Sequence, residues 1–305
     1  MTGRIHYTII ATVYNDEAEI HGLLSDIRKQ TVQPEEVIIV DGGSVDHTVE
    51  VIEGFGGVRL IKGKRLNIAQ GLNVAIKSAL TDLIGIVAVG NRYNEDFFEL
   101  LAEEIQESGV DCTYGYLIGR SDTAFARMYK SFLMKGDYGI PTNHGILIKK
   151  SVFMNNGFFY EGLRYAGEDA EYYRRLQKRG TTSRCVEMAS VYWDTPASYN
   201  DYFLQTRRYL LGEYQISTDR RFVKRYGYHI LYAIVLLGSI PCVILFGKLG
   251  IGVLAMIAAY NLLVMKKGGP GQAVAVNIRA MTYFMSLLWN IPNFGEKIDK
   301  NRLLD

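Results

Sequence analysis

Short apolar runs alternate with amphipathic segments along roughly the first two thirds of the chain. The runs predict buried strands, because they are short, lack polar alternation and stop at turn residues; they lie at 5–13, 36–41, 58–61, 83–89, 110–118, within 145–153 and at 183–193. The segments between them place apolar residues at helical spacing and predict helices, at 17–30, 47–53, within 63–80, at 95–107 and at 168–179. This alternation implies an α/β fold with a parallel sheet and right-handed crossovers. Residues 120–144 are less regular.

The first candidate ligand-binding residues lie at the end of the second predicted strand. The apolar run 37–40 is followed by Asp41, Gly42 and Gly43. Ligands bind at the carboxyl ends of strands in open α/β sheets, and glycines let the backbone turn sharply and approach a ligand. An acid at this position suits hydrogen bonds to a ribose or a uracil edge. The alternative is a plain strand-to-helix turn in which Asp46 caps the next helix.

A basic and aromatic segment, 199–227, follows the α/β region. Cationic side chains that meet lipid phosphates, with aromatic rings at the headgroup level, are typical of the cytoplasmic face of a bilayer. We therefore expect interfacial helices here. An ordinary solvated helix is the alternative.

The remainder, 228–305, is predicted to be a membrane region. Residues 228–246 and 249–265 contain no Asp, Glu, Lys or Arg, and each approaches the roughly 20 residues that cross a hydrocarbon core. Basic residues before the first run and after the second predict a hairpin with both ends cytoplasmic. The run 273–291 is a third span or a helix lying in the interface. A buried all-helical core is the alternative for all three.

Composition narrows the class of protein. The chain has 305 residues, a net charge of +2 and 48% hydrophobic residues, which suggests one large or two modest domains and gives no reason to expect a nucleic-acid partner. Its three cysteines are widely spaced. They form neither a zinc motif nor a disulfide framework, and they fit a reducing compartment.

Four blocks in order resemble glycosyltransferase family 2, whose members have the GT-A, Rossmann-like fold. Residues 9–17 resemble the opening nucleotide-binding strand, 41–48 the D-D/G-G-S-x-D-x-T block, 65–73 the G-x-x-x-A-x-N segment, and 167–171 the E-D block. Residues 205–209 are similar to the Q-x-x-R-W/Y stretch of processive and membrane-linked members. The hydrophobic tail resembles that of bacterial exopolysaccharide glycosyltransferases of the succinoglycan type. The GT-A domain is expected at 1–198.

The resemblance, together with the chemistry of the residues, implies three groups of site residues. Asp169 is the expected base and Glu168 orients it or binds the acceptor; a helix start favours the ionised form of Asp169, although an N-cap pair is the alternative. The nucleotide sugar, a UDP- or GDP-type donor, is expected on Thr12, Tyr14, Glu17, Asp41, Gly43, Arg65, Asn91 and Arg92. Acceptor contacts are expected from His144, Trp193 and Arg208; bystander or core roles remain open for His144 and Trp193.

One block departs from the family pattern. The D-x-D signature that binds Mg²⁺ or Mn²⁺ in the family falls on Ala88, Val89 and Gly90. Without carboxylates, metal affinity should fall sharply. Arg92, Lys64 or Arg65 could stabilise the diphosphate instead, or Asn91 with an acid from elsewhere could hold a weak metal, or catalysis has been lost.

The sequence thus predicts a membrane-anchored inverting glycosyltransferase of the inner (plasma) membrane with a cytoplasmic catalytic domain. It would transfer sugar to a polyprenyl-linked or polysaccharide acceptor in exopolysaccharide biosynthesis; a homo-oligomer is left open. The rival is a catalytically silent family-2-like subunit that binds glycan or a partner. A processive synthase is a third option, but the hydrophobic tail is short for a translocation channel.

Overall fold

The computed structural model describes residues 5–134 and 139–294. The chain divides into two compact units. The sheet unit comprises three segments: the described residues up to Arg120, residues 139–162, and Glu168–Asp194. The helical unit comprises Ser121–Met134, Leu163–Gly167 and the chain from Thr195 onward. The expected domain end at 198 lies close to this last boundary, but two earlier segments belong to the helical unit as well.

One mixed sheet forms the centre of the sheet unit, in the order β3-β2-β1-β4-β7-β6-β8-β5. The strands are β1 Tyr7–Val13, β2 Glu36–Asp41, β3 Arg59–Lys62, β4 Leu83–Val87, β5 Arg92–Tyr93, β6 Cys112–Gly119, β7 Gly145–Lys149 and β8 Ser183–Trp193. The first four are parallel, as expected. The expectation of a wholly parallel sheet is wrong, because β7 runs antiparallel to both β4 and β6, and β5 runs antiparallel to β8.

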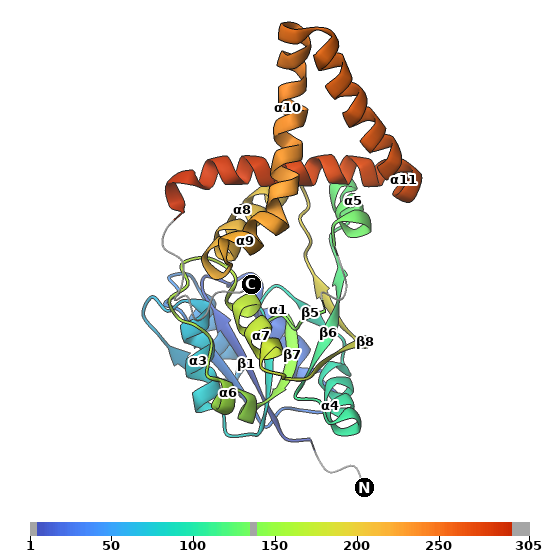
Figure 1. The fold of residues 1–305 in the computed structure, drawn as a ribbon. Coiled ribbons are helices and arrows are strands. Elements are labelled where there is room, and N and C mark those ends of the chain that lie inside the picture. Colours follow the sequence, from blue (N-terminus) through green and yellow to red (C-terminus); the bar gives the residue numbers. More distant parts are fainter. Residues whose placement is uncertain (1–4, 135–138, 295–305) are drawn as a thin grey trace. The chain divides into compact units, whose positions relative to one another are not determined.

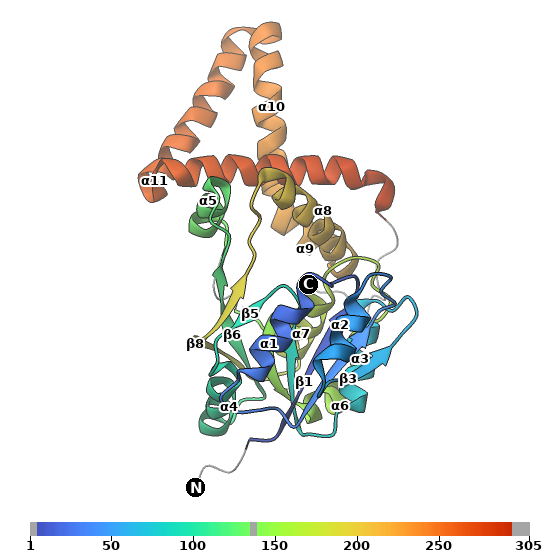
Figure 2. The same ribbon diagram turned by 180° about the vertical axis from the view of Figure 1, so that it is seen from behind.

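Helices cover both faces of this sheet. The helices α3 Ile68–Ser78, α6 Lys150–Asn156 and α7 Glu168–Lys178 lie on the face turned to the viewer in Figure 1. The helices α1 Ile20–Arg28, α2 Thr48–Phe55 and α4 Phe97–Ser108 lie on the other face, seen in Figure 2. Alternate residues of each central strand are therefore buried on opposite sides, which explains the continuous apolar runs in the sequence.

Helix α4 packs closely on the sheet because strand glycines, Gly85 and Gly145 among them, lack a side chain there. A Cβ atom added at Gly85 would lie 2.6 Å from Phe98, and one added at Gly145 would lie 2.7 Å from Phe97. Both phenylalanines are almost completely buried. The glycines thus make the space that the two aromatic rings fill.

The helical unit contains seven helical elements in the part of the chain that the structure describes. They are α5 Ala124–Phe132, α8 Tyr199–Ile216, α9 Asp219–Phe222, a π-helical turn Val223–Gly227, α10 Tyr228–Phe246, α11 Lys248–Asn290 and a 3₁₀ turn Ile291–Asn293. Helix α5 falls in the stretch expected to be irregular. Its start is defined by Thr123, whose side chain accepts a hydrogen bond from the backbone N–H of Ala126 and so satisfies one donor of the first turn.

The apolar C-terminal helices follow the predicted segments closely. Helix α10 ends at Gly247, and α11 is interrupted at Gly269, whose φ of 78° is not helical and which precedes Pro270. The break divides α11 into two helices that coincide with the expected second and third hydrophobic segments. By length and composition, Gly250–Asn293 qualifies as a candidate span among the described residues, and 6% of its apolar window is buried. Crossing of a bilayer stays a prediction, and residues 295–305 of the predicted membrane region lie outside the described residues.

Polar side chains join these apolar helices to each other. The Tyr232 hydroxyl donates to Asn277 Oδ1 at 2.9 Å, Asn277 Nδ2 donates to Asn261 Oδ1 at 2.7 Å, and Asn261 Nδ2 donates to the Tyr232 oxygen at 2.9 Å. This closed ring links α10 with both halves of α11. Such contacts fix the packing of helices that are largely apolar.

Candidate active site

Sheet topology brings the predicted site residues of the sheet unit to one edge. The strands β1, β2 and β4 are parallel and end near Tyr14, Asp41 and Ala88. Strand β7 is antiparallel to β4 and pairs its first residue with Val87, so the segment before it reaches the same edge. Strands β6 and β8 run in parallel and finish together, with Gly119 opposite Trp193. The carboxyl edge of the sheet is therefore the candidate site.

Asp41 shapes the loop that follows its strand. Its carboxylate accepts hydrogen bonds from the backbone N–H of Gly43 at 3.1 Å, from the backbone N–H of Ser44 at 3.0 Å and from the Ser44 hydroxyl at 2.6 Å. The side chain is 3% exposed. Gly43 has a φ of 105°, which favours glycine. The sequence located this acid correctly, but its described partners belong to its own loop, and contact with a nucleoside stays a prediction.

Backbone hydrogen bonds connect this loop to its neighbours. The N–H of Gly42 donates to the Val13 carbonyl at 2.8 Å, and the N–H of Leu66 donates to the Gly42 carbonyl at 3.1 Å. A Cβ atom at Gly42 would lie 3.0 Å from the Leu66 oxygen. Hydrogen bonds thus connect the ends of β1 and β2 with the loop after β3. The close approach of the Leu66 carbonyl to Gly42 depends on the missing side chain of this glycine.

The residues predicted near β1 have different environments. The Thr12 methyl group faces α3, where a Cβ atom on Gly71 would come within 2.6 Å of it. Tyr14 is 59% exposed at the sheet edge and is available to a ligand. Glu17 accepts a hydrogen bond from the backbone N–H of His47 at 2.9 Å, and therefore helps to hold the start of α2.

The two arginines predicted to meet the diphosphate differ as well. Arg65 is exposed in the loop after β3 and has a φ of 54°. Arg92 instead donates to Asp26 of α1 at 2.8 Å and lies over Gly22, where a Cβ atom would be 2.0 Å from its Nη1. Its guanidinium is bound to a structural carboxylate on the helix face of the sheet. The described partner of Arg92 is thus Asp26, and a contact with the diphosphate stays a prediction.

Tyr93 and Asn91 fasten the loop after β4 to His144. The Tyr93 hydroxyl accepts from the backbone N–H of Ala88 at 3.1 Å and donates to the His144 carbonyl. Asn91, which is 2% exposed, directs its amide nitrogen to His144 Nδ1 at 3.0 Å and to the His144 carbonyl at 3.3 Å. An amide N–H donor makes Nδ1 the acceptor, so the neutral imidazole carries its proton on Nε2. Sequence reasoning missed Tyr93.

His144 lies among the predicted acceptor and catalytic residues. Its ring centroid is 5.6 Å from that of Trp193. Burial lowers the pKa of His144, whereas the nearby carboxylate of Asp169 acts in the opposite direction. The imidazole is therefore neutral near pH 7. His144, Trp193 and Asp169, which come from three separate segments, are thus brought together.

The predicted base stands at the start of α7. The helix begins at Glu168, and its first turn carries Glu168, Asp169 and Glu171, where the helix dipole favours negative charge. Asn143 Nδ2 lies 3.5 Å from Glu168 Oε1, and the Tyr173 hydroxyl donates to Asn143 Oδ1 at 2.9 Å. The residue before His144 is therefore tied to the same helix.

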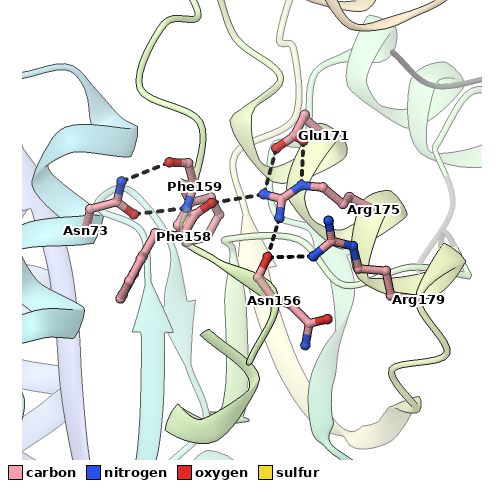
Figure 3. Close-up of polar contacts among 7 residues, drawn as sticks. All are labelled: Asn73, Asn156, Phe158, Phe159, Glu171, Arg175 and Arg179. Carbon is pink, nitrogen blue, oxygen red and sulfur yellow. Dashed lines mark hydrogen bonds and ion pairs between the residues drawn. The ribbon is translucent and has the colours of Figure 1, made fainter. Parts of the chain in front are cut away.

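Side chains from two helices hold the loop that leads to α7, as Figure 3 shows. Asn73 of α3 donates to the Phe159 carbonyl at 2.9 Å and accepts from the Phe159 N–H at 3.0 Å. Arg175 of α7 donates to the carbonyls of Asn156 and Phe158 at 2.8 and 2.9 Å, and pairs with the fully buried Glu171. Arg179 donates to the Asn156 carbonyl at 3.0 Å.

These contacts give one family block a physical role. Asn73 is the last residue of the 65–73 block, and its amide binds both the backbone N–H and the backbone carbonyl of Phe159. Sequence reasoning recognised this block only as a resemblance. The contacts of Arg175 could have been found from the sequence, because Glu171 and Arg175 have the i, i+4 spacing of an ion pair on a predicted helix.

The loop after β4 does not fit a divalent metal. The positions aligned with the metal signature are Ala88, Val89 and Gly90, which offer no side-chain oxygen. In the described ranges 5–134 and 139–294, no group of three or more His, Cys, Asp and Glu side chains is arranged to hold an ion. A hard cation prefers several oxygen ligands, and we assign no chemical step to one here.

An arginine that sequence reasoning missed contacts this loop. Arg120 Nη2 donates to the Gly90 carbonyl at 3.2 Å, and the same guanidinium makes two hydrogen bonds to the carboxylate of Asp194, from Nε at 2.8 Å and from Nη2 at 2.5 Å. Arg120 and Asp194 directly follow the last residues of β6 and β8. The strand-end rule that singled out Asp41 would also have found them.

Arg208, the last predicted acceptor residue, belongs to the helical unit. It is exposed on α8, within the stretch that resembles the Q-x-x-R-W/Y block. Its role stays a prediction.

Comparison with known proteins places the chain among glycosyltransferases. The sequence profile described as glycosyl transferase family 2 matches residues 8–171, and that of glycosyl transferase family group 2 matches residues 91–291. Among curated proteins, the glycosyltransferase GlyG of Streptococcus pneumoniae serotype 4 is 30% identical over 125 residues, which is 39% of this chain and 42% of GlyG. The uncharacterized glycosyltransferase EpsJ of Bacillus subtilis is 27% identical over 108 residues, 34% of this chain and 31% of EpsJ. The match thus spans less than half of either relative.

Solved structures share the fold. The mannosyltransferase PcManGT from Pyrobaculum calidifontis, in complex with GDP-Man and Mn²⁺, superposes with a TM-score of 0.64 at 14% identity, over 95% of this chain and 89% of that one. TarS 1-349 of S. aureus, in complex with UDP, gives 0.51 at 19% identity, over 94% and 92%. The GT-A fold is thereby confirmed. Because the first profile covers more than half of the chain, the protein belongs to glycosyltransferase family 2.

Proposed function

We propose that this protein is an inverting glycosyltransferase that moves a sugar from a nucleotide-sugar donor to a lipid-linked or polysaccharide acceptor. The observation that carries the proposal is the convergence on His144. Its ring is in contact with Trp193, its Nδ1 accepts from Asn91 in the loop after β4, and it lies within electrostatic range of Asp169. A candidate base, an aromatic platform and the loop that meets the donor phosphates in related enzymes are thus adjacent.

The chemistry is a single displacement. The acceptor hydroxyl oxygen attacks the anomeric carbon of the donor sugar, and its proton passes to the Asp169 carboxylate. The bond from that carbon to the diphosphate oxygen breaks, and its electron pair stays on the leaving nucleoside diphosphate. Attack from the face opposite the leaving group inverts the anomeric centre. Glu168, one residue before the base, orients it or binds the acceptor.

The acceptor is inferred from the C-terminal helices. Many large apolar side chains of α10 and α11 are exposed, among them Ile244, Leu245 and Leu262, and so large an apolar surface is typical of a membrane-facing segment. Together with the basic segment 199–227, it supports anchoring at the cytoplasmic face of the inner membrane. An enzyme held there meets a polyprenyl-linked glycan that never leaves the bilayer.

The rival function is a catalytically silent subunit that binds glycan or a partner enzyme. The absence of side-chain oxygens at Ala88, Val89 and Gly90 favours it, because related enzymes use a metal there. The presence of Glu168 and Asp169 at the start of α7 favours the enzyme.

Release of sugar from UDP- and GDP-sugars by the full chain in detergent or nanodiscs tests the proposal. The enzyme should hydrolyse one donor slowly in the absence of acceptor, and Asp169→Asn should lose transfer while binding the nucleotide as before. Wild-type turnover in the Asp169→Asn variant removes this residue from the mechanism. Nucleotide binding without turnover of any donor supports the silent subunit.

A further inference from the structure

The loop that replaces the metal signature is in contact with a guanidinium group. Arg120 Nη2 donates to the Gly90 carbonyl at 3.2 Å, and the backbone N–H of Arg120 donates to the Trp193 carbonyl at 2.8 Å. The side chain is therefore held against the loop on which the metal signature of the family pattern falls.

Asp194 orients this guanidinium and leaves one of its amino groups to solvent or ligand. The two side chains share two hydrogen bonds, from Nε and Nη2, whereas Nη1 makes no hydrogen bond within the described part of the chain. About a third of the side chain is exposed, at 33%. A planar fork held on one edge presents its other edge in a fixed direction.

The guanidinium of Arg120 stays protonated. Its hydrogen bond to Asp194 raises its pKa, as do the carboxylates of Glu19 and Asp26. Asp26 is itself paired with Arg92. A diphosphate would therefore meet a permanently charged donor.

The other candidate cations are less well placed. Arg92 is bound to Asp26. Lys64 and Arg65 follow β3, which is separated from β4 by β2 and β1 in the sheet order. Arg120 directly contacts the loop after β4.

We propose that Arg120 takes the place of the divalent ion in this enzyme, with Nη1 meeting the diphosphate of the donor, so that sugar transfer does not require a metal. This inference rests on the proposed function. As the bond to the anomeric carbon breaks, negative charge grows on the leaving phosphate oxygen, and a preorganised charged donor stabilises it. Arg120 remains protonated throughout, and the acceptor proton goes to Asp169.

Nucleotide binding in EDTA tests the inference without relying on turnover. UDP, UMP, GDP and GMP are titrated against the full chain, and the ratio of the monophosphate Kd to the diphosphate Kd is measured for the nucleotide that binds. The wild type should prefer the diphosphate about tenfold or more. Arg120→Met should bring the ratio close to one, and Arg120→Lys should lie between them. A merely structural role would weaken both nucleotides equally.

Arg184→Met is the matched control. Arg184 lies at the opposite end of the β6–β8 pair and forms an exposed ion pair with Glu104 at 2.6 Å. Its loss removes an arginine–carboxylate pair between β8 and α4 and should leave the binding ratio unchanged.

Turnover supplies the second readout. Wild-type transfer should be equal in EDTA and Mn²⁺ within about twofold, and Arg120→Met should lose about 100-fold or more in kcat/KM. Loss of wild-type transfer in chelator, with recovery only on added metal, overturns the inference, as does a wild-type diphosphate preference in Arg120→Met. If no donor turns over, the proposed function fails while the binding ratio still decides the role of Arg120.

Discussion

Arg175 contacts both carboxylate oxygens of Glu171 one helical turn earlier, with Nε at 2.7 Å and Nη2 at 3.2 Å. Glu171 is fully buried, and the same guanidinium binds the carbonyls of Asn156 and Phe158. The pair therefore joins α7, whose first turn holds the candidate base, to the loop that precedes it.

Removing one partner of this pair should be costly. Arg175→Met leaves the Glu171 carboxylate buried without its cation, and we expect a loss of about 3–5 kcal/mol in the free energy of unfolding. Denaturant titration of the full chain measures it. Arg184→Met, which removes an exposed pair, should cost less than about 1 kcal/mol. Equal losses in the two variants would show that the buried pair has no special role.

The second prediction concerns Asp41. Asp41→Ala leaves the N–H groups of Gly43 and Ser44 without their acceptor, and should lower the free energy of unfolding by about 2 kcal/mol. Because the loop then loses its shape, nucleotide affinity should fall about tenfold or more. Ser44→Ala, which removes only the 2.6 Å hydroxyl contact, should cost less in both measurements. Unchanged nucleotide affinity in Asp41→Ala would separate this loop from the donor site.

The third prediction is a pH dependence from His144. Its pKa is lowered in the fold, chiefly by burial, so the unfolded chain binds the proton more tightly. Folding stability should therefore be fully present above about pH 6.5, the ordinary pKa, and should decline as pH falls from there toward the lowered value. The difference in unfolding free energy between wild type and His144→Gln, measured from pH 5 to 7.5, should increase with pH. A constant difference would contradict the shift.

Gly212 carries the fourth prediction. A Cβ atom at this position in α8 would lie 1.4 Å from the Ala166 carbonyl oxygen, so Gly212→Ala must displace either the helix or the segment before Glu168. We expect a loss of about 3 kcal/mol in stability, seen as a lower thermal midpoint. Gly54→Ala in α2, where nothing lies within 4 Å, should instead be neutral or stabilising by up to about 1 kcal/mol. Tolerance of Gly212→Ala would show that α8 and the segment at Ala166 can separate without loss of stability.

The fifth prediction addresses the polar ring between the apolar helices. Asn261→Leu removes the donor to Tyr232 and the acceptor for Asn277, and should destabilise the helical unit by about 0.5–2 kcal/mol. Unfolding in mixed detergent micelles measures this loss. Leu262→Ala changes the neighbouring, 63% exposed residue and should have a smaller effect. The reverse order would exclude the ring as a stabilising contact.

The loss of the metal ligands can be seen in the sequence, whereas the pairing of the nearby arginines cannot. The missing carboxylates at Ala88, Val89 and Gly90 are evident in the sequence, and in the described residues the fold supplies no substitute ligand set. Arg92, Lys64 and Arg65 were open alternatives as the compensating cation, and the sequence did not indicate which carboxylate each arginine meets. Arg92 pairs with Asp26, which is 66 residues away in sequence, and Arg120 pairs with Asp194, which is 74 residues away.

The amino-acid sequence by itself determined the succession of strands and helices, the acid at the end of β2, and the acidic start of α7. These features depend on local periodicity, turn residues and the helix dipole, all of which act within a few residues. Only the tertiary structure decided the reversed direction of β7, the convergence on His144 and the partner of each arginine. A long cationic side chain has several carboxylates within reach, and strand pairing across the whole sheet selects which of them it meets.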